Sequence, residues 1–195
     1  MSEPTTKERS INFSAWEVRA TLAGLKTQFR RFANLNESLF QDKWPDLKAT
    51  AIEAALKCSP FQVGDRLAVR EAWCCRLDCL SPHVSVAKSL HYTHYRADAK
   101  EFSPDDEDNW HDYGRKWRSS ATMPRWASRL KLEIAEVSVA QLQDMTGKDV
   151  AAEGMPFSRD IDVFKQHWNA ANKKHPWSSS PWAWVVTYRC VENES

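Results

Sequence analysis

The stretch SAWEVRATLAGLKTQFRRF, residues 14–32, contains the signals for a helix, a turn and a strand in direct succession. Ser14 and Glu17 have the spacing of a capping box, in which each side chain can bond the other's backbone N–H, so a helix should begin here. Gly24 stands where a left-handed residue would end that helix after about ten residues. The polar leader before it, residues 1–10, is expected to be disordered, with structure beginning at Ile11.

The strand predicted over residues 26–32 has two chemically different faces. Alternation places the following side chains on one face: Lys26, Gln28 and Arg30. It places these on the other: Thr27, Phe29 and Arg31. The glycine turn therefore leads directly into a lysine at the start of a polar strand face.

A second alternating run covers residues 67–73, after a turn at residues 63–66. Leu67, Val69, Glu71 and Trp73 share one face of this predicted strand, so a carboxylate stands in register with three apolar side chains. If that face is the core, Glu71 must be paired or have a raised pKa, because burial of an unpaired charge is very costly. Two interpretations stay open, a salt-bridged structural acid and a catalytic acid.

Further helices and strands are predicted from periodicity and capping signals. Helices are expected in the second half of residues 34–57 after the break at Trp44-Pro45, from Thr146 to the stop at Gly154, and over residues 160–172. Strands are expected from Leu130, with a shift of phase at Ala135-Glu136, and over residues 182–190.

The inward faces of two helices can also be predicted from their spacing. In the first helix this face carries Leu47, Ala51, Ala54 and Ala55. In the last it carries Val163, Phe164, His167 and Trp168, and we interpret the histidine as a packing residue. Four tryptophans on apolar faces are expected in the core: Trp73, Trp168, Trp182 and Trp184.

Residues 74–113 are predicted to be irregular, and the charges near them are strongly polarised. Residues 98–112 contain seven acids and one lysine, whereas residues 114–131 contain six basic residues and no acid. Trp117 and Trp126 lie among the basic residues, a combination that offers charge to phosphates and flat rings to bases. The alternative interpretation is an internal salt bridge between the acidic and the basic segment.

Composition excludes several classes of protein. The 195 residues carry a net charge of +1 and are 42% hydrophobic, which argues against wholesale disorder, and the chain has 10 Trp but only 5 Gly. No apolar run is long enough for a membrane span, and the N-terminus lacks the apolar centre of a secretory signal. We therefore expect a protein of the cytoplasm, that of a bacterial host if a phage encodes it.

Five cysteines without a framework-like spacing argue against a secreted disulfide scaffold. Cys74, Cys75, Cys79 and His83 could supply zinc ligands, but the paired spacing of common structural zinc sites is missing. Half-buried thiols are the favoured interpretation, and no metal or cofactor is predicted.

Several segments together resemble the ASCH domain family of the PUA-like superfold, as found in phage and prophage proteins. The family's G-x-K-x-x-[ET]-x-R signature falls on Gly24, Lys26 and Arg31. Further similar segments are residues 64–71, 123–129, 142–154 and 182–186. The resemblance covers residues 11–32 and 60–191, with insertions near 33–58 and 78–115.

The resemblance implies an α+β fold, a curled β-barrel with flanking short helices, as a single domain over residues 11–191. It also implies a site for RNA, single-stranded nucleic acid or modified bases. Some ASCH relatives are hydrolases, either ribonucleases or amidohydrolases of N4-acetylcytidine that use a lysine, a threonine and a glutamate. Carried over, the lysine falls on Lys26 and the glutamate on Glu153, but the threonine position holds Phe29, which can neither attack a carbonyl nor move a proton.

Three functions follow as alternatives. The favoured one is a nucleic-acid-binding module that uses Lys26, Arg31, Trp73, Arg115, Lys116, Trp117, Arg118, Arg125 and Trp126, with Glu71 beside them. The second is a metal-independent hydrolase in which Lys26, Glu153 and Glu71 are catalytic. The third is an interaction protein without either activity. The oligomeric state is not predicted.

Overall fold

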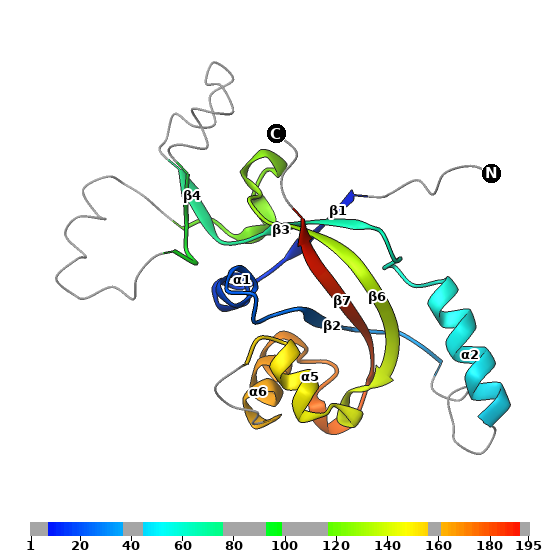
Figure 1. The fold of residues 1–195 in the computed structure, drawn as a ribbon. Coiled ribbons are helices and arrows are strands. Elements are labelled where there is room, and N and C mark those ends of the chain that lie inside the picture. Colours follow the sequence, from blue (N-terminus) through cyan, green and yellow to red (C-terminus); the bar gives the residue numbers. More distant parts are fainter. Residues whose placement is uncertain (1–7, 37–44, 76–92, 99–116, 156–160, 192–195) are drawn as a thin grey trace, which may run out of the picture. The chain divides into compact units, whose positions relative to one another are not determined.

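The computed structural model describes residues 8–36, 45–75, 93–98, 117–155 and 161–191 (Figure 1). The chain divides into two compact units. Unit 1 contains residues 23–65 and 133–189, together with residues 1–6, and unit 2 contains residues 7–22, 66–132 and 190–195.

Backbone hydrogen bonds join five strands in the order β1-β3-β6-β7-β2. These strands are β1 (Glu8–Asn12), β3 (Arg66–Arg70), β6 (Lys131–Gln141), β7 (Trp182–Val191) and β2 (Gln28–Phe32). With the helices they make a mixed α+β fold, as predicted. Among the described residues no pairing closes the sheet between β1 and β2, so the closed barrel that was expected is not found.

The core of unit 1 forms where β2 runs antiparallel to β7. Phe29 pairs with Val186 and Arg31 with Trp184 across the two strands. The strand predicted over residues 182–190 is confirmed, and its side chains from Trp182 to Val186 are all buried. A strand that is covered on both faces needs apolar residues at consecutive positions, which explains the run WAWVV.

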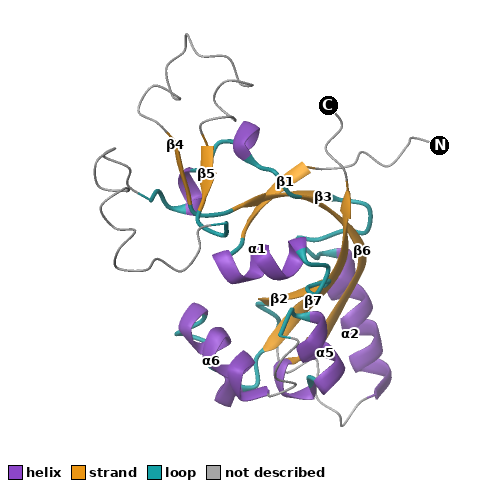
Figure 2. Ribbon diagram, turned by 60° about the vertical axis from the view of Figure 1, so that its left-hand side comes forward, coloured by secondary structure: helices purple, strands orange, loops and turns teal. Residues whose placement is uncertain are grey.

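Two helices of unit 1 lie side by side, α5 (Gly147–Ala152) and α6 (Ile161–Ala171), as Figure 2 shows. The predicted start of α5 is confirmed, because Thr146 and Asp149 form a complete capping box. Its predicted end is confirmed by Gly154, whose φ of 90° is the left-handed conformation that terminates a helix. Glu153 occupies the C-cap of this short helix.

The inward faces predicted for two helices of unit 1 are partly wrong. Helix α2 (Pro45–Lys57) begins at the expected proline, but Leu47 is 58% exposed and only Ala55 of the predicted face is buried. In α6 Phe164 and Trp168 are buried as expected, whereas His167 is exposed and is not a packing residue. Helical spacing selects a stripe of residues, and which edge of the stripe meets the core depends on tertiary packing.

Strand β6 changes its pattern of burial where the sequence predicted a shift of phase. Leu132 and Ile134 are buried in alternation, and Ala135 and Glu136 are then exposed in succession. The 3-10 turns η6 (Leu142–Asp144) and η7 (Trp177–Ser179) complete the described part of unit 1.

Unit 2 begins with β1 and α1 (Ala15–Leu22). The expectation of disorder up to residue 10 is wrong for residues 8–10, because Glu8 to Ser10 pair in parallel with Arg66 to Ala68 of β3. Residues 1–7 lie outside the described residues. The start of α1 is confirmed, since Ser14 donates from its backbone nitrogen to Glu17 Oε2 at 2.8 Å. The helix ends before Gly24, whose φ is 69°.

The single strand predicted over residues 67–73 is two strands. β3 ends at Arg70, and β4 (Trp73–Cys75) pairs antiparallel with β5 (Thr93–Tyr95) in a separate two-stranded sheet. The prediction of irregular structure is therefore wrong at residues 74–75 and 93–95, and residues 76–92 and 99–116 lie outside the described parts. The 3-10 turns η4 (Ser120–Thr122) and η5 (Arg125–Ala127) follow.

The four tryptophans predicted to be in the core are buried, with exposed fractions between 1% and 6%: Trp73, Trp168, Trp182 and Trp184. No helix in the described ranges is long and apolar enough to cross a membrane.

Candidate functional site

Lys26 and Glu153 form a buried ion pair in unit 1. Lys26 Nζ donates to Glu153 Oε2 at 2.8 Å and to the backbone oxygen of Glu153 at 3.1 Å. The exposed fractions are only 2% for Lys26 and 3% for Glu153. The structure therefore brings together the lysine and the glutamate that the resemblance had placed in one site.

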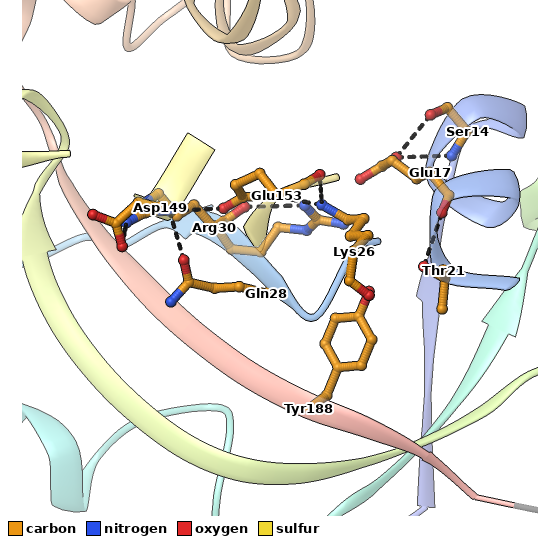
Figure 3. Close-up of polar contacts among 10 residues, drawn as sticks. Ser14, Glu17, Thr21, Lys26, Gln28, Arg30, Asp149, Glu153 and Tyr188 are labelled. Atoms are coloured by element: carbon orange, nitrogen blue, oxygen red, sulfur yellow. Dashed lines mark hydrogen bonds and ion pairs between the residues drawn. The ribbon is translucent and has the colours of Figure 1, made fainter. Parts of the chain in front are cut away.

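Arg30 extends this pair into a network. Its Nη1 donates to Glu153 Oε1 at 2.9 Å and to Gln28 Oε1 at 3.0 Å, and its Nη2 lies 3.1 Å from Asp149 Oδ1. We call these five side chains the Lys26 network: Lys26, Gln28, Arg30, Asp149 and Glu153. Figure 3 shows them converging from β2 and from α5.

Local structure explains why these side chains meet. The alternation of the strand places Lys26, Gln28 and Arg30 on one face, as the sequence predicted. The backbones of Lys26 and Glu153 form an isolated antiparallel β-bridge. Next to it, the Thr27 backbone nitrogen donates to the Ala152 backbone oxygen at 2.9 Å. The start of β2 is thus bonded to the end of α5. Tyr188 adds a further restraint, because its hydroxyl donates to the Lys26 backbone oxygen at 3.0 Å.

The charges of the Lys26 network compensate one another, since Lys26 and Arg30 face Glu153 and Asp149. Arg30 is only 6% exposed. Burial alone would raise the pKa of Asp149, but hydrogen bonds from Thr146 and the Arg30 guanidinium outweigh it and hold that pKa below its ordinary value. The network therefore holds its donors and acceptors in fixed positions.

Phe29 lies on the opposite face of β2 and belongs to the core. It is fully buried, with its ring centroid 5.4 Å from that of Phe61 and 5.9 Å from that of Tyr188. The Arg31 guanidinium lies over the same ring at 5.2 Å. Phe29 is therefore a packing residue, and Arg31 is held against it on the face away from Lys26.

Glu71 belongs to unit 2, where its carboxylate is paired with Arg129. Arg129 Nε donates to Glu71 Oε1 at 2.8 Å and its Nη2 to Oε2 at 3.2 Å. The same guanidinium donates to Asp98 at 2.6 and 2.9 Å and lies 4.1 Å from the centre of the Tyr95 ring. Burial raises the pKa of Glu71, and the contact with Arg129 opposes that rise only in part.

The Arg129 contacts bear on two predictions, the pairing of Glu71 and the salt bridge between the acidic and the basic segment. Glu71 is buried and is paired, and its pKa is raised, as was predicted for a carboxylate on an apolar strand face. Asp98, the first acid of the acidic segment, pairs with Arg129 of the basic segment, which is the internal salt bridge considered as an alternative. The remaining acids of residues 99–112 lie outside the described residues.

Trp73 is surrounded by protein and cannot offer its ring to a base. It is 1% exposed and packs with Met123 and Ala127, with Trp126 edge-on at 6.1 Å. The Arg118 guanidinium lies 5.3 Å from its ring centre. The expectation that Trp73 lines a binding surface is corrected by this burial, whereas its assignment to the core is confirmed.

The other predicted nucleic-acid residues of unit 2 differ in accessibility. Trp117 and Trp126 are half-buried, as is Arg118. The Arg125 side chain is 61% exposed and its Nη2 lies 2.7 Å from Glu8 Oε1. Arg115 and Lys116 lie outside the described residues. The described part of the basic segment thus has one well-exposed cation, already paired with a carboxylate.

The possible zinc ligands are only partly described. Cys74 is a buried free cysteine, and Cys79 and His83 lie outside the described residues. Within the described ranges no group of three or more His, Cys, Asp or Glu side chains could hold a metal ion.

Sequence reasoning missed Arg30, Gln28 and Asp149 as members of the site. Two signals pointed to them: the alternation that places Gln28 and Arg30 beside Lys26, and the capping box that places Asp149 one helical turn before Glu153.

Comparison with known proteins gives one similarity in fold. The structure is similar to the crystal structure of an ASCH domain from Lactobacillus crispatus JV V101, with 13% sequence identity and a TM-score of 0.45, over 94% of this chain and 79% of that one. No protein-family model and no curated protein matches the sequence. A functional proposal must therefore rest on the chain's own residues.

Proposed function

We propose that this chain binds single-stranded or modified nucleic acid, RNA foremost, and that the Lys26 network contacts a base. The observation that carries the proposal is the set of buried, mutually bonded charges formed by Lys26, Arg30 and Glu153. Such a network is poorly explained by stability, because well-packed apolar side chains of similar volume would stabilise a fold as well or better. Groups of interacting charged side chains of this kind also occur at ligand sites.

Exposure supports contact with a ligand at one edge of this network. Lys26, Arg30 and Glu153 are buried, but Gln28 is half-buried and the Asp149 side chain is 28% exposed. An approaching base would therefore meet an amide and a carboxylate that Arg30 already holds in place.

Arg125 of unit 2 supports a separate contact with the phosphate backbone. Its ion pair with Glu8 is exposed on both sides, with side-chain exposures of 61% and 37%. Exposed pairs contribute little to stability, so exchanging the carboxylate for a phosphate costs the fold little. The half-buried ring of Trp126 next to it offers partial stacking.

Fluorescence anisotropy with short labelled RNA and DNA strands tests the proposal. Binding should weaken linearly on a logarithmic salt scale, because phosphate contacts release counterions. Replacement of Lys26 by methionine in the folded protein should lower the affinity. No binding of any strand at low salt, or binding that is independent of salt, would overturn the proposal.

A hydrolase is the second candidate, and the 2.8 Å contact between Lys26 Nζ and Glu153 Oε2 favours it. A lysine and a carboxylate in contact can serve as a charge stabiliser and a general acid or base. The position of Phe29 in the core argues against a covalent mechanism there, and Thr27 lies on the face away from Lys26.

Turnover of RNA and of modified nucleosides tests this second candidate. Lys26→Ala and Glu153→Gln should each abolish product formation if the pair is catalytic. Equal product from the variants and the natural sequence would exclude catalysis by this pair.

A further inference from the structure

The half-exposed edge of the Lys26 network consists of Gln28 and Asp149. Arg30 determines that Gln28 presents a hydrogen-bond donor there and Asp149 an acceptor. Two nitrogens of its guanidinium hold the two groups. Nη1 donates to Gln28 Oε1 at 3.0 Å and Nη2 lies 3.1 Å from Asp149 Oδ1. Because these nitrogens are adjacent on one planar group, Gln28 and Asp149 lie side by side.

Arg30 also fixes the orientation of the Gln28 amide. A guanidinium can only donate hydrogen bonds, so the amide must turn its oxygen toward Arg30 and its nitrogen away. Figure 3 shows this nitrogen pointing away from the network. No partner for it occurs within the described residues. Gln28 therefore presents two N–H groups to whatever contacts the edge.

Asp149 presents the opposite character. Its Oδ2 accepts from the Thr146 backbone nitrogen at 2.8 Å and from the Thr146 hydroxyl, whereas Oδ1 faces Arg30. A carboxylate oxygen can accept more than one hydrogen bond, so Oδ1 can still accept a hydrogen bond from an N–H or O–H group of a ligand. The low pKa of Asp149 keeps this group an acceptor at neutral pH.

We infer that this edge selects bases with a carbonyl next to a ring N–H, namely uracil and guanine, over cytosine and adenine. The inference rests on the proposed nucleic-acid binding. Gln28 donates to the base carbonyl and Asp149 accepts from the ring N–H. Cytosine and adenine carry the reverse pair, an amino donor next to a ring acceptor. Their amino group would meet the N–H donors of Gln28, and their ring nitrogen would meet the acceptor oxygen of Asp149.

The test compares binding of oligouridylate and oligocytidylate strands of equal length at neutral pH and one salt concentration. The two strands have the same phosphate charge, so backbone contacts cancel in the ratio of their affinities. The natural sequence should prefer the uridine strand by about tenfold, the effect of leaving one or two polar groups unsatisfied. Gln28→Met, which removes both donors, should lower this ratio and leave only the part of the preference that Asp149 contributes.

Gln28→Glu gives a sharper test, because it replaces the outward donor by an acceptor. The Arg30 guanidinium can still bond one of its oxygens, while the other meets the base. The uridine preference should then be lost, since a carboxylate at position 28 attracts the amino group of cytosine and repels a carbonyl, which offsets the preference that Asp149 keeps. Gln166→Met is the matched control: Gln166 is exposed on α6, and its replacement should leave the ratio unchanged.

The outcomes separate this inference from the proposed function. If the natural sequence binds neither strand, nucleic-acid binding itself fails. If it binds both strands equally, or if its preference is undiminished in Gln28→Met and Gln28→Glu, binding stands and the inference about Gln28 and Asp149 is overturned. The natural sequence alone gives the first two results, so they do not depend on the folding of a variant.

Discussion

Lys26 Nζ lies 2.8 Å from Glu153 Oε2, although 127 residues separate the two in the chain. The contact requires β2 and the end of α5 to be placed together, so its energy reports on the packing of unit 1. Both side chains are almost completely buried, and Glu153 is also paired with Arg30, so these charges depend on one another rather than on water.

Breaking this pair should be strongly destabilising. Lys26→Met and Glu153→Gln should each lower the free energy of unfolding by about 3 kcal/mol, because the first leaves the buried Glu153 with Arg30 alone and the second removes the carboxylate that faces Lys26. The double variant should cost less than the sum of the two. Urea unfolding measures all three. Lys57→Met, in the exposed pair with Glu53, is the control and should change little; additive effects at Lys26 and Glu153 would contradict a coupled pair.

Introducing the family's hydroxyl at position 29 should not create activity. Phe29→Thr should destabilise the chain by about 3 kcal/mol, because it leaves a cavity between Phe61 and Tyr188. The new hydroxyl would point into the core, away from Lys26. Urea unfolding and an assay for release of acetate from N4-acetylcytidine check the two parts. A stable variant that gains hydrolysis would show that this face of β2 can reach substrate.

The stability contributed by Glu71 should fall as pH rises. Burial raises its pKa in the folded chain above the ordinary value of 4.5. The folded state therefore binds this proton more tightly than the unfolded state does. The stability that Glu71 contributes is fully present at a pH below its pKa in the unfolded chain. This stability is lost as the pH rises through its pKa in the folded chain. Urea unfolding from about pH 4 to 8 should show the natural sequence losing stability relative to Glu71→Gln.

Asp98→Asn provides the control for this pH dependence. It removes the more exposed carboxylate on Arg129 but keeps Glu71 buried, so the decline relative to Glu71→Gln should persist. A difference that stays flat, or that grows with pH, would mean that Arg129 holds Glu71 ionised across the whole range.

Arg125 and Glu8 should have opposite effects on nucleic-acid affinity. Arg125→Ala should weaken binding equally for all sequences and reduce the salt slope by about 1, because one phosphate contact is lost. Glu8→Gln should strengthen binding, since it removes the carboxylate that competes for Arg125. Anisotropy titrations at several salt concentrations check both, and the same direction of change in the two variants would rule out a phosphate contact at Arg125.

The sequence predicts those features that depend on neighbouring residues. The bond from Ser14 to Glu17, the capping box of Thr146 and Asp149, and the left-handed Gly24 and Gly154 mark where α1 and α5 begin and end, and each involves residues no more than a few positions apart. Alternation likewise predicts that Lys26 and Arg30 share a face.

Tertiary partners could not be predicted in this way. Alternation continues unbroken from Leu67 to Trp73, yet β3 ends at Arg70 because Trp73 pairs with Tyr95, across residues that give no strand signal. His167 follows the helical spacing of buried residues but falls just outside the buried stripe. Alternation places Arg30 beside Lys26, but nothing near Arg30 in the sequence indicates that Glu153 and Asp149 lie next to it in the fold.

The length of α5 carries a constraint on change in this chain. Asp149 and Glu153 are four residues apart, about one helical turn, so both carboxylates point to the same side and both reach Arg30. Inserting or deleting one residue between them would rotate one carboxylate by about 100° relative to the other. Substitution at the exposed Lys148 would leave this geometry intact. The spacing between Asp149 and Glu153 is therefore constrained together with these two residues, whereas an exposed position such as Lys148 can vary in residue type.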